Sequence, residues 1–245
     1  MWRFRITVAT HLLTYFFSIL KMRKMAKDDN CSEEKRYAYL RKIVHKVMWG
    51  RNFIRTEGYG MEYLPEEGGY VMYPNHQGKY DAYGIISVHE KPLTAVMDKE
   101  KSYDLFIKQV IDMLNGKRLD KQNVRQAFGV INEITEEVKQ GRRYIIFPEG
   151  EYDEEKKNTL REFKAGCFKT SLKSKTPVVP VALVDSYKAW NTSQWGTVTT
   201  QVHFLEPIFY EEYKDMKTQE LAELVKSRIR EKLNEVCGEI ELSKS

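Results

Sequence analysis

The sequence predicts an α/β fold in which helices flank a mostly parallel sheet, with two further helices at the N-terminus. Segments with strand character alternate with segments of helical periodicity, an order that is typical of parallel sheets. The 245 residues, 42% of them hydrophobic, supply enough apolar side chains for one sizeable core. We therefore expect one main domain, residues 51–245, after an N-terminal segment of residues 1–50.

The N-terminal segment combines an apolar stretch, residues 6–20, with concentrated positive charge. Six basic residues precede the first acid of the chain, namely Arg3, Arg5, Lys21, Arg23, Lys24 and Lys27. As a helix the apolar stretch extends about 22 Å, less than the roughly 30 Å of a bilayer core, and no small-residue cleavage site follows it. We expect a retained, monotopic or peripheral helix that is attracted to anionic lipid headgroups. The alternative is a helix that only packs on the domain.

A second helix is expected from Ser32, because Ser-Glu-Glu is a helix-start signal. Apolar residues then recur at helical spacing, at Tyr37, Leu40, Val44, Val47 and Met48.

Six strands are expected after these two helices, at residues 53–63, 70–73, 93–97, 144–147, 178–184 and 198–204. Glycine and proline cluster between the first two strands, and Pro74 ends the second. The next three are short apolar runs, which suit buried parallel strands. The last strand alternates apolar and polar residues, as a half-buried strand does.

Five helices are expected between and after the strands, at residues 79–88, 103–114, 124–138, 163–172 and 221–233. In the third, apolar residues recur every three or four positions from Val124 to Val138, and Gly141 is the expected C-terminal stop. The polar residues 115–123 before it are expected to form a loop.

The cysteines Cys31, Cys167 and Cys237 are odd in number and lack the short spacing of metal ligands. They argue against a disulfide scaffold or a structural zinc site, and they indicate a reducing compartment.

A histidine and an aspartate lie five positions apart, directly after an expected strand, where α/β proteins place ligand-binding loops. If His76 lies in the loop and Asp81 in the first turn of the next helix, the two side chains can meet. The carboxylate then fixes the imidazole tautomer and leaves the other ring nitrogen free to deprotonate a hydroxyl. An ordinary loop histidine is the alternative.

Two further groups of residues are candidates for binding an anion. The turn Phe147-Pro148-Glu149-Gly150 ends another strand and is able to direct backbone N–H groups at a ligand. Four basic residues around the start of the long helix favour a phosphate, namely Lys117, Arg118, Lys121 and Arg125. A plain strand-terminating turn and a solvated basic face are the alternatives.

In this order and spacing, these residues resemble the 1-acyl-glycerol-3-phosphate acyltransferase family of PlsC-like glycerolipid acyltransferases. Asn75, His76 and Asp81 match its NHxxxxD block, and residues 147–150 match its FPEG block. Residues 163–166 and 177–183 look like two later blocks, so that the resemblance covers roughly residues 70–207.

The resemblance implies that a fatty acyl group moves from an acyl carrier protein or coenzyme A thioester to the free hydroxyl of 1-acyl-glycerol-3-phosphate, giving phosphatidic acid. It makes His76 the general base and Asp81 its orienting partner, with no acyl-enzyme, metal or further cofactor. Cys167 is then not required as a nucleophile. Substrate binding falls to Asn75, Arg118, Lys121, Phe147, Pro148, Glu149 and Gly150.

On the same resemblance, residues 51–245 form the acyltransferase catalytic domain, and residues 1–50 form helices that attach to the cytoplasmic face of a membrane. The expected partners are a lysophospholipid acceptor, the thioester carrier and the membrane surface, and no nucleic acid is expected.

The sequence departs from the family pattern at two positions. Tyr152 stands where members commonly have the arginine of Thr-Arg-Ser after FPEG, and Lys121 stands where they have a second phosphate-contacting arginine. Arg118 is a candidate to compensate, since a lysine lacks the bidentate fork of arginine. These departures leave open a different lysophospholipid or an amine acceptor, or a catalytically silent lipid-binding module. A hydrolase is disfavoured, because no GxSxG nucleophile motif is present.

Overall fold

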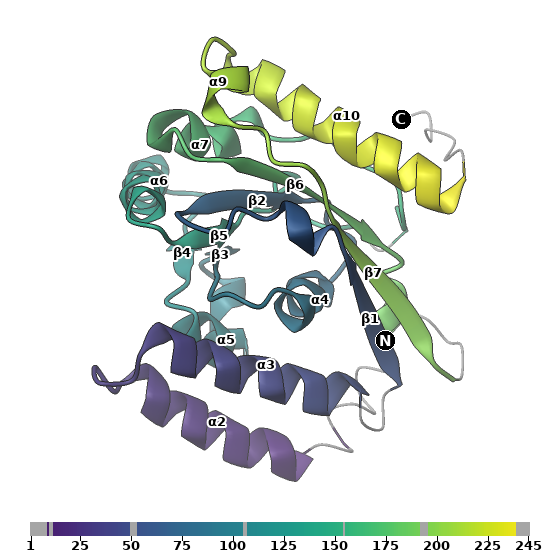
Figure 1. Ribbon diagram of the computed structural model, residues 1–245. Coiled ribbons are helices and arrows are strands. Elements are labelled where there is room, and N and C mark those ends of the chain that lie inside the picture. The colour runs from purple at the N-terminus through teal and green to yellow at the C-terminus, as the bar shows by residue number, and fades with distance from the viewer. Residues whose placement is uncertain are drawn as a thin grey trace.

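The computed structural model describes residue 9 and residues 12–49, 53–104, 107–153, 155–191 and 196–238. A seven-stranded sheet lies between two layers of helices (Figure 1). Its strands are β1 (Ile54–Tyr59), β2 (Tyr70–Pro74), β3 (Thr94–Asp98), β4 (Lys117–Leu119), β5 (Arg143–Ile145), β6 (Val178–Val184) and β7 (Val198–Phe204).

Across the sheet the strands follow the order β1-β7-β6-β2-β5-β3-β4. All neighbouring pairs are parallel except β6 and β7, which are antiparallel. The prediction of a mostly parallel α/β sheet is therefore confirmed.

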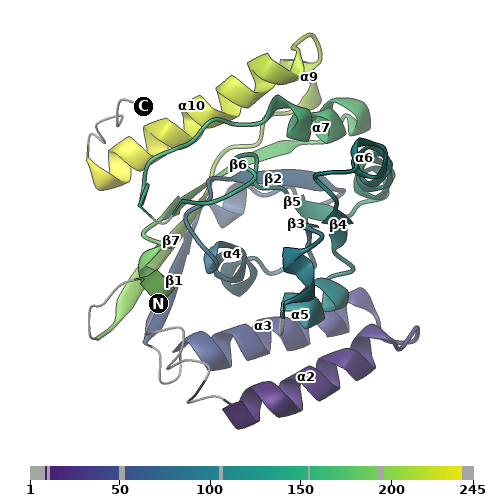
Figure 2. The ribbon, with the colours of Figure 1, turned by 180° about the vertical axis from the view of Figure 1, so that it is seen from behind.

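The helices are α2 (Leu12–Ala26), α3 (Glu33–Trp49), α4 (Asp81–Val88), α5 (Ile107–Met113), α6 (Val124–Lys139), α7 (Lys169–Ser174), α8 (Lys188–Asn191), α9 (Tyr210–Tyr213) and α10 (Thr218–Cys237). Helices α6, α7 and α10 cover one face of the sheet, and α2 to α5 lie on the other (Figures 1 and 2).

The core has two parts, one on each face of the sheet. Every residue of β2 and β6 is buried, because helices cover both faces of these central strands. Strand β7 buries Val198, Thr200, Val202 and Phe204 in alternation, as its sequence pattern predicts.

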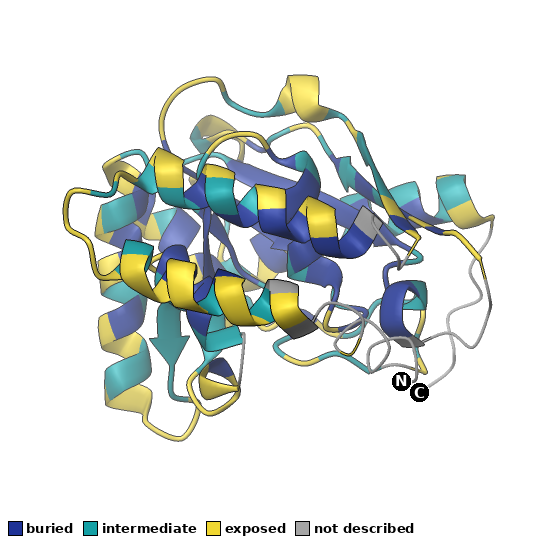
Figure 3. Ribbon diagram, turned by 90° about the horizontal axis from the view of Figure 1, so that it is seen from below, coloured by how far each residue is buried: buried dark blue, intermediate teal, exposed yellow. Residues whose placement is uncertain are grey.

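The two N-terminal helices differ in how they are held. Helix α3 packs into the core, where the hydroxyl of Tyr37 donates to the carbonyl oxygen of His89 at 3.0 Å. Its first residue, Glu33, is ion-paired with Arg142 at 2.9 Å. Helix α2 buries Met22 against this core. Figure 3 views this side of the molecule, on which exposed positions alternate with buried ones along the helices.

Helix α2 covers the second half of the apolar stretch and continues into the basic residues that follow it. Residues 6–8, 10 and 11 of that stretch lie outside the described residues. No helix in the described part of the chain has both the length and the apolar character to cross a bilayer.

Four local predictions were wrong. The strand expected over residues 53–63 ends at Tyr59, and residues Met61–Tyr63 form a 3₁₀ turn instead. Residues 115–123 contain the short strand β4, which pairs with β3 at the edge of the sheet.

Of the helix expected over residues 103–114, the described residues show α5 at Ile107–Met113, whereas Tyr103 ends a separate 3₁₀ turn at Lys101–Tyr103. The carboxylate of Asp98 accepts the backbone N–H groups of Glu100 and Lys101 at the start of that turn.

The helix expected over residues 163–172 begins only at residue 165, with a 3₁₀ turn that leads into α7. The backbone N–H of Lys164 donates to the carbonyl oxygen of Pro148 at 2.9 Å, which holds residues 163 and 164 in an extended segment beside the FPEG turn.

Candidate active site

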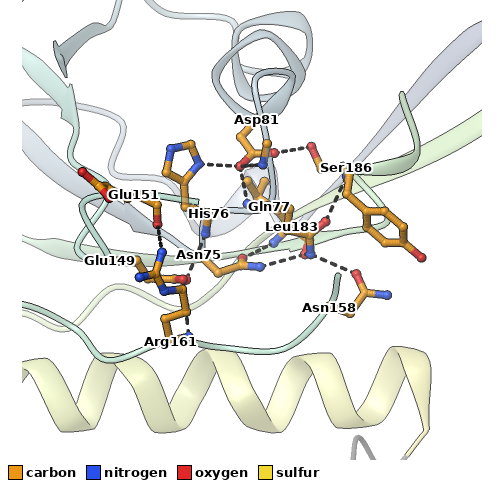
Figure 4. A network of polar contacts seen from close by, with 12 residues as sticks. Asn75, His76, Gln77, Asp81, Glu149, Glu151, Asn158, Arg161, Leu183 and Ser186 are labelled. Atoms are coloured by element: carbon orange, nitrogen blue, oxygen red, sulfur yellow. Dashed lines mark hydrogen bonds and ion pairs between the residues drawn. The ribbon is translucent and has the colours of Figure 1, made fainter. Parts of the chain in front are cut away.

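Three loops meet where the central strands β2, β5 and β6 reach their carboxyl ends (Figure 4). They bring together residues 75–81, residues 147–150 and residues 185–186. The convergence follows from the topology, since β2 is parallel to both of its neighbours and the three strands end on the same side.

His76 and Asp81 form the centre of this arrangement. Nδ1 of His76 and Oδ2 of Asp81 are 2.7 Å apart, and because the carboxylate only accepts, Nδ1 carries the hydrogen. The carboxylate is fully buried, whereas the imidazole is 18% exposed. Nε2 points away from Asp81 (Figure 4) and is the ring nitrogen able to take up a proton. The structure thus brings the two residues together as the sequence predicts.

The Asp81 carboxylate is held by three further hydrogen bonds. Oδ2 also accepts from the backbone N–H groups of Gln77 at 2.6 Å and Gly78 at 2.9 Å. Oδ1 accepts from the hydroxyl of Ser186 at 2.6 Å. With both oxygens occupied, the carboxylate has one orientation, and so does the imidazole bonded to it.

Asn75 and Gln77 attach the histidine loop to strand β6. The side-chain amide of Asn75 donates to the carbonyl oxygen of Leu183 at 3.1 Å, and its oxygen accepts from the backbone N–H of Leu183 at 2.7 Å. Gln77 donates to the same carbonyl oxygen and to Asn158. Asn75 was expected to bind substrate, and in this structure its side chain positions the loop.

Glu149 of the FPEG turn attaches the same loop to the segment after β5. One carboxylate oxygen accepts from the backbone N–H of His76 at 3.0 Å, and the other accepts from the backbone N–H of Arg161 at 3.3 Å. Only 3% of Glu149 is exposed, and this burial raises the pKa of its carboxyl group to about 7. Glu149 thus links the backbone of His76 to the backbone of Arg161.

Two aromatic rings hold the imidazole from different directions. The ring of Phe147 stacks on His76 at 4.2 Å between centroids, and the ring of Tyr152 meets it edge-on at 5.0 Å. These contacts restrict rotation of the imidazole about its side-chain bonds. They also give one side of the site an apolar wall.

Gly150 and Lys121 complete the turn. Gly150 has φ of 75°, in the left-handed region that favours glycine. Nζ of Lys121 donates to the carbonyl oxygen of Gly150 at 3.1 Å and is ion-paired with Glu151 at 3.0 Å and Asp98 at 3.3 Å. The structure therefore places Lys121 beside the FPEG residues.

Arg118 lies in a different environment. Its guanidinium is ion-paired with Asp112 at 2.6 Å and donates to the hydroxyl of Ser102 at 3.1 Å. It also lies over the ring of Tyr103, at 5.3 Å from the centroid. These partners direct Arg118 toward α5, although Lys121, three residues later, reaches the FPEG turn.

Sequence reasoning missed several residues of this network. Ser186 follows β6 by two positions, and its side chain reaches the histidine loop because β6 pairs with β2, a neighbour relationship that no local sequence pattern indicates. Asn158 and Arg161 lie in a charged loop, where neither spacing nor residue type distinguishes them. Tyr152 stands out in the sequence only as a departure from the family pattern.

Cys167 lies in the 3₁₀ turn Ala165–Phe168 and is partly buried, and desolvation raises the pKa of its thiol to about 11. A thiol with this pKa is protonated near neutral pH and is a poor nucleophile. The expectation that Cys167 takes no covalent part in the chemistry agrees with this environment.

Comparison with known proteins gives consistent matches. The family model described as "Acyltransferase" matches residues 55–184, which is more than half of the chain. The 1-acyl-sn-glycerol-3-phosphate acyltransferase of Escherichia coli is 26% identical over 174 residues, covering 71% of this chain and 70% of that protein. The enzyme of the same name from Saccharomyces cerevisiae is 27% identical over 171 residues, covering 68% of this chain and 56% of the yeast protein.

A solved structure resembles nearly the whole fold. The crystal structure of the 1-acyl-sn-glycerophosphate (LPA) acyltransferase PlsC from Thermotoga maritima matches with a TM-score of 0.74, covering 96% of this chain and 94% of that one. At 19% sequence identity, this likeness establishes the shared fold.

Proposed function

The chain belongs to the acyltransferase family, and on that premise we propose that it transfers a fatty acyl group from a thioester carrier to the free hydroxyl of 1-acyl-glycerol-3-phosphate. The product is phosphatidic acid, and the carrier released is a free thiol. The observation that carries the proposal is the buried Asp81 carboxylate bonded to His76, with the second imidazole nitrogen left free at the edge of the sheet.

The chemistry needs one general base. Nε2 of His76 takes the proton of the acceptor hydroxyl as its oxygen attacks the thioester carbonyl carbon, and Asp81 stabilises the imidazolium that forms. The tetrahedral intermediate collapses, the carbon–sulfur bond breaks, and the imidazolium returns the proton to the leaving sulfur. The ester and the free thiol balance the reaction without an acyl-enzyme, a metal ion or a cofactor.

The aromatic contacts and the Glu149 bridge support the assignment of His76. A general base acts best when it is held at a fixed distance from the hydroxyl that it deprotonates. Glu149 holds the backbone of His76, and Phe147 holds its ring.

Lys121 lies beside the FPEG turn together with Lys164, whose ammonium packs against Gly150, and Arg161, whose guanidinium donates to the carbonyl oxygen of Glu151. We propose that Lys121 faces the acceptor's phosphate.

A second acceptor class is supported by Tyr152. Its ring stands beside His76, at the position where the family pattern has an arginine, and a phenol offers a phosphate no positive charge. An acceptor with a less charged headgroup, such as another lysophospholipid or an amine, does not need a cation at the position of Tyr152. Acceptor competition between 1-acyl-glycerol-3-phosphate and neutral lysophospholipids distinguishes the two.

Membrane association is part of the proposal. Helix α2 exposes four large apolar side chains on one face, at Leu13, Phe16, Phe17 and Leu20. With basic residues in its last turn, this helix has the character of one that lies in the bilayer interface. We propose a monotopic or peripheral enzyme on the cytoplasmic face, where acceptor and product both reside in the bilayer.

The experiment that tests the function is transfer of a labelled acyl group to 1-acyl-glycerol-3-phosphate in detergent, from acyl carrier protein and from coenzyme A in parallel. We expect phosphatidic acid from one or both donors, and the ratio of the two rates identifies the carrier. Replacing His76 with alanine is expected to lower turnover about 10²–10⁴-fold, the usual contribution of a general base.

The matched control is His45→Ala, which removes an exposed histidine from α3. It is expected to retain full turnover. Near-normal turnover in His76→Ala contradicts the assignment of the base, and absence of product from the wild type with either donor contradicts the acceptor or the reaction.

A further inference from the structure

A polar cavity lies where the end of helix α2 meets helix α5 and strand β4. Its volume is about 640 Å³. Six charged side chains line it, namely Arg23, Lys27, Lys108, Asp112, Lys117 and Arg118. It therefore joins the N-terminal helix to the edge of the sheet, through residues that the proposed reaction does not use for proton transfer.

The charge of the lining is strongly asymmetric. Five of the six charged groups are cationic, and Asp112 is the one carboxylate among them. Asp112 is shared between Lys108 at 2.5 Å and Arg118 at 2.6 Å. In the part of the chain that the structure describes, Arg23 and Lys27 have no carboxylate within ion-pairing distance. Lys117 is also ion-paired, with Glu133 at 3.2 Å and Glu137 at 2.6 Å, so the repulsion that a bound anion removes comes mainly from Arg23 and Lys27 beside the partly compensated Lys108 and Arg118.

Two of the cations are partly buried and fixed in place. The side chains of Lys117 and Arg118 are 20% and 23% exposed. Glu137 on helix α6 holds Lys117 at 2.6 Å, while Ser102 and Asp112 hold Arg118. The guanidinium of Arg118 is thus held in one orientation, with Nε bonded to Ser102 and Nη2 to Asp112, and within the described chain Nη1 remains as its donor for a phosphate oxygen.

A favourable interaction with the helix dipole explains only part of this arrangement. Basic residues commonly occupy the last turn of a helix, and this accounts for Arg23 at the end of α2. It does not account for Lys117 and Arg118, which belong to a strand, or for their convergence with Arg23 on one cavity.

The exposed apolar face of α2 identifies the source of the anion. Leu13, Phe16, Phe17 and Leu20 lie on one face of the helix that ends at the cavity. When this face enters the acyl-chain boundary of a bilayer, the basic end of α2 lies at the depth of the lipid phosphates.

We propose that this cavity binds the phosphate group of an anionic phospholipid headgroup, at a site separate from the one where His76 acts. This inference rests on the membrane association in the proposed function. The bound lipid fixes the end of α2 against β4, and it orients the domain on the membrane surface.

The test compares vesicles of equal surface charge that differ in the anionic group. Phosphatidylcholine vesicles carry either phosphatidylglycerol, which has a phosphate diester, or oleate, which has a carboxylate. Phosphatidylglycerol is chosen because it is not the expected product. We expect the wild type to bind the phosphatidylglycerol vesicles about tenfold more tightly, and Arg23→Gln with Lys27→Gln to abolish that preference.

The matched control is Lys21→Gln with Lys24→Gln, which removes the same charge from the same N-terminal segment but from positions outside the cavity lining. This control is expected to weaken binding to both kinds of vesicle and to keep the preference for phosphatidylglycerol. Equal loss of preference in the two double variants means that only general surface charge matters, and it overturns the proposal. So does a wild type without the preference.

Two additional measurements distinguish a lipid from a soluble phosphate, and the cavity from the catalytic centre. If glycerol 3-phosphate in solution removes the preference at a concentration comparable to that of the accessible lipid, the site takes a soluble phosphate and the lipid assignment is wrong. Acyl transfer in detergent is measured beside the vesicle assay, and Arg23→Gln with Lys27→Gln is expected to retain it. Absence of transfer in the wild type contradicts the proposed function. The vesicle preference still tests whether the cavity binds a lipid phosphate.

Discussion

The hydroxyl of Ser186 donates a 2.6 Å hydrogen bond to Oδ1 of Asp81, although 105 positions separate the two residues in the chain. Both side chains are buried. Ser186 therefore fixes the oxygen of the carboxylate that His76 does not use, and it acts on the base through Asp81.

Replacing Ser186 with alanine is expected to lower kcat about tenfold or more, with little change in KM. A hydrogen bond to a buried charged group contributes roughly 1.5–3 kcal/mol, and its loss lets the carboxylate and the imidazole turn. Steady-state kinetics measures the effect. The control is Ser174→Ala, since Ser174 is also buried but bonds Ser171 and Thr176 at the end of α7. Equal kcat values in the two variants would remove Ser186 from the catalytic network.

Glu149 is expected to make stability depend on pH. Its pKa of about 7 in the folded protein lies above the ordinary value of 4.5, so the folded protein keeps a proton that the unfolded chain releases between these pH values. The stabilisation that this group adds to the free energy of unfolding is fully present below pH 4.5 and is lost as the pH rises through 7. Its upper bound is about 3 kcal/mol.

Urea denaturation across that pH range measures this effect in the wild type and in Glu149→Gln, which cannot titrate. The variant is expected to show a smaller fall in unfolding free energy as pH rises. Glu211→Gln, at an exposed position paired with Lys214, serves as the control and is expected to follow the wild type. Parallel curves for Glu149→Gln and the wild type would contradict the raised pKa.

Tyr152→Arg is expected to lower KM for 1-acyl-glycerol-3-phosphate about tenfold. A guanidinium beside His76 offers the acceptor's phosphate a charge-assisted, bidentate contact that the phenol lacks. KM is measured for this acceptor and for a neutral lysophospholipid. Tyr152→Phe keeps the ring against His76 and is expected to leave the ratio of the two KM values unchanged. An unaltered ratio in Tyr152→Arg would show that this position does not face the headgroup.

Phe16→Ser with Phe17→Ser is expected to weaken binding to neutral vesicles by more than tenfold. The two side chains are 57% and 66% exposed in the structure, and burying each in the bilayer interface is worth roughly 1.5–3 kcal/mol. Vesicle cosedimentation measures the change. Val124→Ser, at an 82% exposed position at the start of α6, is the control for loss of an exposed apolar side chain. If both changes have the same small effect, α2 does not insert.

Much of the fold was predictable, because most elements carry a strong periodic signal. The continuous apolar run of β6 indicates a buried strand, and the three-to-four spacing of α6 indicates an amphipathic helix. Strand β4 was not predictable. It has three residues, Lys117, Arg118 and Leu119, and it is held by backbone pairing with β3 at the sheet edge, so that no apolar alternation marks it.

The contacts of the site between residues close together in the chain were predictable. His76 and Asp81 meet across one strand–loop–helix connection, so the six residues 76–81 contain both partners of the contact. Arg118 and Lys121 show the limit of such reasoning, because side-chain direction at the sheet edge sends one to Asp112 and the other to the FPEG turn. The bonds from Gln77 to Asn158 and from Asp81 to Ser186 depend on tertiary contacts and leave no mark on local sequence.

The attachment of the histidine loop to residues far along the chain has a consequence for folding. His76 and Gln77 depend on Glu149 and Leu183, which are 73 and 106 positions away. Local helices form quickly, whereas contacts that close long loops form slowly. During refolding, helical circular dichroism is therefore expected to return before activity does. During synthesis, the catalytic centre cannot assemble until residue 186 has left the ribosome.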